Sequence, residues 1–256
     1  FGPTFRMRYG YTLEAFIHKR MPTGTVMVKE TGGDDGSQVA TTAAAELGNV
    51  HAQGMGGRVG QATTRQLQKA VERGIPDAER EKEVVVAGQP VDVTFCASGN
   101  LGQVYFHAFA HRATLDELNA AFPGLVDDIV AHEGVGFVVG LGAEGRPIVI
   151  GKGGTRDLAT GDMGDDADDV VDGNDPLAPY GDAALRAWQV GRMAGFPSAG
   201  DLIIMSTIYP DGTVAAFEEL IGSHGGLGGE QTDAFILHPA DFVVPPTRSA
   251  ADLFPL

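Results

Sequence analysis

The chain has 256 residues with 34 acidic and 18 basic side chains and a formal net charge of −16, which argues against a nucleic-acid-binding surface and against docking on anionic lipid, because both need clustered Lys and Arg. This length is enough for one large domain or two small ones. The single cysteine, Cys96, excludes a disulfide framework within the chain, and no apolar run reaches the roughly 18 residues of a membrane segment.

The first residues, Phe1-Gly2-Pro3-Thr4, contain no Met, no basic stretch and no apolar run of a signal peptide. We therefore expect the chain to be a fragment or a processed product of a longer protein. Residues 9–21 predict a helix, with Thr12 as N-cap and apolar side chains on one face, and Pro22 ends it.

Residues 31–64 are small, polar and rich in glycine, which predicts a flexible insert with a short Ala-rich helix near 39–47. A second helix is expected at 63–73. Strands follow in β-branched runs at 83–87 and 91–97, and residues 102–106 are expected to continue the second of these strands.

Thr114 is a predicted helix N-cap, because Glu117 stands three residues later and completes a capping box. Further helices are expected at 125–131 and 183–194, and a hairpin is expected from two strands at 136–140 and 147–150. The remaining strands are expected at 201–207, 214–217 and 235–237, with a turn at 209–212 between the first two. The alternation of strands and helices indicates an α/β fold.

Residues 162–175 hold seven Asp and no Lys or Arg, which predicts an acidic solvated loop outside the core. Residues 168–173 only faintly match a calcium-binding EF-hand loop, because the bidentate Glu of that motif is absent. Gly151-Lys152-Gly153-Gly154 fails the phosphate-loop pattern and predicts a turn. His107 and His111 could share one face of a helix and bind a metal, but they stand where a strand is ending.

Gly222-Ser223-His224-Gly225-Gly226 places one imidazole on a glycine-rich turn. A histidine presented by backbone in this way is suited to bind a metal through a neutral ring nitrogen. The alternative interpretation is a histidine that serves the turn by hydrogen bonding. The residues alone leave both interpretations open.

Gly222-Ser223-His224-Gly225 resembles the last metal-ligand motif of the alkaline phosphatase superfamily, in the branch of type I phosphodiesterases and nucleotide pyrophosphatases. Residues 219–239 are similar to a bacterial subgroup, some members of which carry a membrane segment before the enzymatic domain. Residues 2–5 and 8–10 resemble the segment just downstream of the family's Asp-His-Gly metal motif. Similarity extends to most of the chain except 31–64, and includes residues 97–101, 115–124, 151–154, 175–181 and 200–202.

The resemblance implies a single incomplete domain over 1–256, the C-terminal part of an alkaline phosphatase-like sheet with helices on both faces, interrupted by the flexible insert at 31–64 and the acidic loop at 162–175. The parent would hydrolyse phosphoric esters at a two-zinc site, with Mn²⁺ as an alternative metal. Only His224 is carried over as a ligand, because the nucleophile and the other ligand motifs are absent from this sequence. The partner of this chain would be the missing N-terminal part of the protein, and the parent could be membrane-attached.

In such a site two metals clamp a phosphoryl oxygen. The second ring nitrogen of His224 would need an acceptor, and Glu218 or Glu219 could supply it. The chain alone is expected to be inactive. The rival hypothesis is a non-catalytic binding or regulatory module in which His224 is a turn residue.

Overall fold

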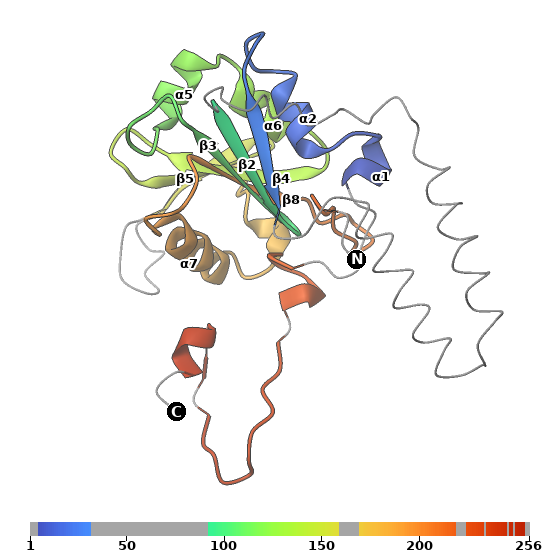
Figure 1. Cartoon of the computed structure of the whole chain (residues 1–256). Coiled ribbons are helices and arrows are strands. Elements are labelled where there is room, and N and C mark those ends of the chain that lie inside the picture. The colour runs from blue at the N-terminus through green and yellow to red at the C-terminus, as the bar shows by residue number, and fades with distance from the viewer. Residues whose placement is uncertain are drawn as a thin grey trace, which may run out of the picture.

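The described strands form one mixed sheet (Figure 1). Their order across the sheet is β1-β2-β3-β8-β4-β5-β6-β7. The computed structural model describes residues 5–31, 92–158, 169–218, 224–232, 234–244, 246–247 and 249–253. Within this part of the chain the strands are β1 Met27–Thr31, β2 Val93–Ser98, β3 Leu101–Phe106, β4 Val135–Leu141, β5 Pro147–Gly151, β6 Gly154–Asp157, β7 Val170–Gly173 and β8 Leu202–Ser206.

Only β1 and β2 pair in parallel, and every other neighbouring pair of these strands is antiparallel. Strand β8 is the last of the described strands in the sequence, yet it lies between β3 and β4 in the middle of the sheet. The sheet therefore consists of two groups of strands, β1 to β3 and β4 to β7, which β8 joins.

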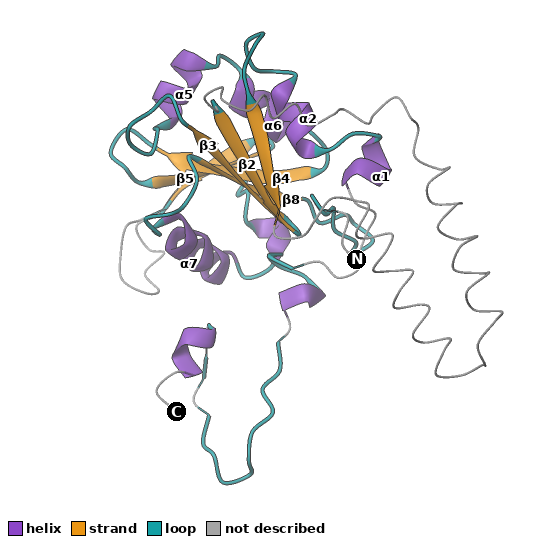
Figure 2. Ribbon diagram, viewed as in Figure 1, coloured by secondary structure: helices purple, strands orange, loops and turns teal. Residues whose placement is uncertain are grey.

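Helices cover both faces of the sheet, which confirms the α/β expectation (Figure 2). One core contains side chains of α1, α2, α5 and α6, and the other contains side chains of α7. The bounds of these helices are α1 Phe5–Tyr9, α2 Leu13–His18, α5 Leu115–Ala121, α6 Leu125–Ala131 and α7 Ala183–Ala194.

Alternation along the central strand explains why there are two cores. Leu202 and Ile204 of β8 belong to the first core, whereas Ile203 and Met205 belong to the second. Successive side chains of a strand point to opposite faces, so a strand covered on both faces must be apolar throughout. Burying each such Leu or Ile side chain contributes about 1.5–3 kcal/mol.

The predicted capping box forms at the start of α5. The Thr114 side chain accepts from the Glu117 backbone N–H, and the Glu117 carboxylate accepts from the Thr114 backbone N–H. These contacts satisfy two backbone donors that the first turn of a helix leaves without partners. The helices expected at 125–131 and 183–194 and the hairpin of β4 and β5 are also confirmed.

Three strand predictions need correction. Residues 102–106 do not continue β2 but turn back as part of β3, since Gly99 and Asn100 form a two-residue connection between the strands. Residues 214–217 are buried, but their backbone bonds go to strand ends and to a turn, so no strand forms. Residues 235–237 have no strand partner within the described residues.

A C-terminal arm, residues 234–244, runs away from the sheet after the short helix η4 Glu230–Thr232 (Figure 1). Phe235 and Leu237 are 90% and 93% exposed, and Val243 is 84% exposed. Large apolar side chains at this level of exposure leave apolar surface in water along the arm.

Several predictions lie outside the described residues: nearly all of the insert at 31–64, the helices at 39–47 and 63–73, and the strand at 83–87. The single-domain interpretation stays a prediction. Throughout the described part of the chain, every helix falls short of the length and apolar character needed to cross a membrane.

Candidate functional site

His224 lies at the end of the β2–β3 hairpin and is held there at two points. Its backbone carbonyl accepts from the Asn100 N–H at 2.9 Å. Its ring atom Nδ1 lies 3.2 Å from the Ser98 hydroxyl oxygen. The ring itself is exposed, and Nε2 makes no hydrogen bond within the described residues. The imidazole is thus fixed through one nitrogen and open at the other.

Asn100 closes the hairpin turn from inside the molecule. It is fully buried, and its side-chain amide donates to Ser206 Oγ at 3.1 Å and to the Ala215 carbonyl at 2.5 Å. The Asn100 carbonyl accepts from the Ser206 N–H at 3.0 Å. A buried polar side chain is tolerated only when it is hydrogen-bonded in this way. The turn under His224 is therefore tied to the end of β8.

Gly99 also binds Glu218 to this junction, by which we mean the β2–β3 turn and the end of β8 beneath His224. The Gly99 N–H donates to Glu218 Oε2 at 2.9 Å, and the Gly99 carbonyl accepts from the Phe217 N–H at 2.7 Å. Gly99 has φ 59°, a conformation that favours glycine. Glu218 is 5% exposed, and its Oε1 has no hydrogen-bond partner within the described residues.

The structure describes one of the two predicted hydrogen-bond acceptors for the His224 ring. Glu218 binds the backbone of the turn and not the histidine ring. Glu219 lies outside the described residues. The residue at the ring is Ser98, whose hydroxyl lies beside Nδ1. The signal that could have identified it is its place as the last residue of a strand that ends in a tight hairpin.

The glycine after His224 has a steric reason to be there. Gly225 has φ 73°, and a Cβ at this position would lie 2.8 Å from the Ser98 carbonyl oxygen. A side chain at Gly225 would push the histidine segment away from the hairpin. The glycine-rich sequence around His224 thus allows its close approach to Ser98.

The described residues by themselves do not fit a metal ion. Nowhere in this part of the chain do three or more His, Cys, Asp or Glu side chains come together as a group that could hold one. His107 contacts Thr94 Oγ1 at 2.8 Å, whereas His111 contacts Glu117 at 3.0 Å, so the H-x-x-x-H pair binds two separate partners. Where the structure describes the chain, His224 therefore has no companion ligands.

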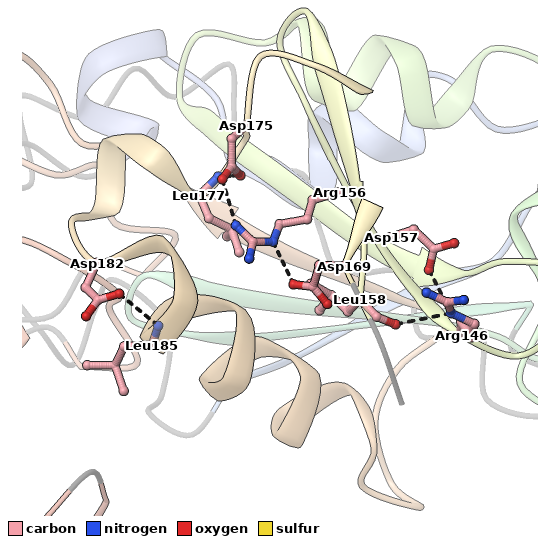
Figure 3. Close-up of polar contacts among 9 residues, drawn as sticks. All are labelled: Arg146, Arg156, Asp157, Leu158, Asp169, Asp175, Leu177, Asp182 and Leu185. Atoms are coloured by element: carbon pink, nitrogen blue, oxygen red, sulfur yellow. Dashed lines mark hydrogen bonds and ion pairs between the residues drawn. The ribbon is translucent and has the colours of Figure 1, made fainter. Parts of the chain in front are cut away.

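The acidic stretch at 162–175 is partly corrected. Residues 162–168 lie outside the described residues, but Asp169 and Asp175 bind the buried guanidinium of Arg156 at 2.8 and 2.7 Å (Figure 3). Asp175 also accepts from the Leu177 N–H at 2.9 Å. Asp169 and Asp175 thus belong to a buried ion-pair cluster around Arg156 and are not part of a solvated loop.

His132 packs against four aromatic rings at centroid distances of 4.6 to 6.1 Å, those of Phe5, Tyr9, Tyr11 and Phe16. Its Nδ1 accepts from the Gly134 N–H at 3.1 Å, so Nε2 carries the proton toward the Tyr11 hydroxyl at 3.0 Å. Burial lowers the pKa of this imidazole. In the sequence, the closely spaced aromatic residues at the start of the chain were the signal that could have indicated an aromatic cluster.

No family model, no curated protein and no solved structure matches this chain. The relationship to the alkaline phosphatase superfamily therefore stays a prediction from the sequence motifs. Within the Gly-Ser-His-Gly motif, His224 and Gly225 belong to the described residues, while Gly222 and Ser223 lie outside them.

Proposed function

We propose that this chain contributes one metal ligand, His224, to a hydrolase of phosphoric esters that resembles the type I phosphodiesterases and nucleotide pyrophosphatases. The nucleophile and the companion ligands would lie outside the described residues, in the N-terminal part of a longer protein. Zn²⁺ is the metal that the resemblance favours, with Mn²⁺ as the alternative. Alone, the chain is expected to be inactive.

The observation that supports this proposal is the open Nε2 atom of an exposed imidazole whose other nitrogen contacts Ser98. Metal-binding histidines characteristically have one ring nitrogen on the metal and the other on a hydrogen-bonding group. The junction beneath the ring is buried and hydrogen-bonded through Asn100 and Glu218. A rigid support of this kind is what a ligand position needs.

The test compares two proteins on one substrate, bis(p-nitrophenyl) phosphate with added Zn²⁺. We expect no turnover from residues 1–256 alone, and turnover from the longer protein that includes the upstream reading frame. His224→Ala in the longer protein should reduce activity by more than the roughly 10- to 100-fold that loss of an outer-shell partner costs. His18→Ala is the matched control, because His18 is exposed and bonds only the Thr25 carbonyl among the described residues.

Turnover by the isolated chain would contradict the proposal, as would full activity of the His224→Ala protein. An upstream frame that encodes neither an Asp-His-Gly motif nor a Thr or Ser nucleophile would also contradict it. Those outcomes would favour the second candidate, a non-catalytic binding or regulatory module.

The second candidate has its own supporting observation. The His224 carbonyl and the Gly225 backbone close the end of the β2–β3 hairpin, which is a structural role that needs no metal. The C-terminal arm exposes apolar side chains that suit a partner surface. A module of this kind would retain partner binding in the His224→Ala variant.

A further inference from the structure

We infer that Ser98 is a positioning residue for His224: its hydroxyl accepts the Nδ1 proton of the neutral ring, so that Nε2 is left with a free lone pair. The contact itself, 3.2 Å between Ser98 Oγ and His224 Nδ1, comes from the geometry. The choice of which atom carries the proton rests on the proposed function, because a ligand histidine must offer an unprotonated nitrogen.

A neutral imidazole has one N–H and one acceptor nitrogen, and the group at one nitrogen fixes the state of the other. If Ser98 accepts from Nδ1–H, Nε2 is an acceptor and can bind a cation. If Ser98 donates to Nδ1, the ring proton lies on Nε2, and Nε2 has no lone pair with which to bind a cation. A serine hydroxyl can accept or donate. The histidine can therefore act as a ligand through Nε2 only when the ring proton lies on Nδ1, in the hydrogen bond to Ser98.

Both sides of the contact are anchored, which is why the hydroxyl can act on the ring. Ser98 is the last residue of β2 and pairs with Leu101 across the hairpin. The next residue, Gly99, donates to the buried Glu218 carboxylate. On the other side, the His224 backbone is bonded to Asn100. Both backbones are thus tied to the same hairpin turn, which places the ring and the hydroxyl within hydrogen-bond distance.

The chain contains an internal control on the same strand. Thr94 of β2 also bonds a histidine ring through its hydroxyl, at 2.8 Å from His107 Nε2. This pair is equally exposed but lies at the far end of the strand from His224. Thr94→Val removes a hydroxyl from the same strand without touching the proposed contact.

The experiment is a long-range ¹H–¹⁵N correlation spectrum of the full 256-residue chain labelled at histidine, recorded at about pH 9, well above the usual imidazole pKa of about 6.5. A His224→Gln spectrum assigns the resonances. In the parent chain we expect the neutral His224 ring to be protonated mainly on Nδ1. Ser98→Ala should lower the ratio of the Nδ1–H to the Nε2–H form about fivefold, as expected for one net hydrogen bond. Ser98→Thr should restore it, and Thr94→Val should leave it unchanged.

The inference is overturned if the parent chain already holds the proton on Nε2, or if Ser98→Ala leaves the ratio unchanged. This result is separable from the hydrolysis assay, because the spectrum needs neither metal nor substrate. An Nδ1–H ring in a protein without hydrolase activity would uphold the role of Ser98 while removing the proposed function. An active longer protein with an Nε2–H ring in this chain would do the reverse.

Discussion

The surroundings of His132 make the stability of the chain depend on pH. The lowered pKa of its ring is caused first by burial and then by the positive charges of Lys152 and Arg20, while Glu133 opposes the shift. A lowered pKa means that the folded chain binds fewer protons than the unfolded chain in mild acid. The stability contributed by the neutral ring is therefore present in full above the unfolded pKa, about 6.5, and is lost as pH falls through the folded pKa.

We expect the free energy of unfolding to fall between about pH 8 and about pH 5, by about 1.4 kcal/mol for each unit by which the His132 pKa is lowered. His132→Gln should remove this component, because an amide does not titrate. Urea denaturation at several pH values measures it. His18→Gln, at an exposed ring, is the control. The same pH slope in parent and His132→Gln chains would refute this expectation.

Loss of Arg156 should cost the folded chain several kcal/mol of stability, about the cost of breaking a buried ion pair. Its side chain is 7% exposed and binds Asp169, 6% exposed, and Asp175, 21% exposed (Figure 3). Arg156→Met would leave two carboxylates without their cation in a poorly solvated place. Removing one partner of a buried pair costs about 3–5 kcal/mol, and we expect a loss in that range by chemical denaturation.

The neighbouring pair of Arg146 and Asp157, 3.0 Å apart and about one third exposed, supplies the comparison. Arg146→Met should cost only about 0–1 kcal/mol, because water solvates both groups when they are separated. Equal losses for the two variants would show that burial is not what makes the Arg156 cluster stabilising.

At the level of elements, the arm at 234–244 is the segment of the described chain that we expect to be most sensitive to proteases. It has no regular structure, and its large apolar side chains are exposed. A protease needs several residues in an extended, accessible conformation, which the arm offers and the sheet does not.

We expect chymotrypsin, within the described residues, to cut first after Phe235, Leu237 or Phe242. Phe95 and Phe137 are fully buried in strands and are the internal controls. Mass spectrometry of early digestion products identifies the sites. First cuts in β2 or β4 would be incompatible with this assignment of exposed and protected segments.

Elements that depend on nearby residues could be predicted from the sequence, and those that depend on distant pairing could not. The start of α5 is set by Thr114 and Glu117, three residues apart. Strand β1, in contrast, exists because it pairs with β2, where Met27 lies beside Val93. Residues 235–237 have the composition of a strand but lack a partner within the described residues, so their propensity alone does not decide their structure.

The same reason limits what could be predicted of the candidate site. His224 was recognisable because its signal, a glycine-rich turn, is local. Ser98 lies 126 positions away in the sequence, and Glu218 reaches Gly99 across 119. No spacing rule connects such residues, so the contact that orients the ring emerged only with the fold. The metal-ligand role of His224 and the superfamily relationship remain predictions.

At the scale of the whole molecule, the order of the strands determines how much of the chain must be synthesised before the sheet can form. Strand β8 ends at Ser206, and it supplies the inner edge for both β3 and β4. A ribosome must therefore deliver the chain through this residue before the two groups of strands can be joined into one sheet. Until then two apolar strand edges stand open in the nascent chain, a state that invites aggregation and chaperone binding.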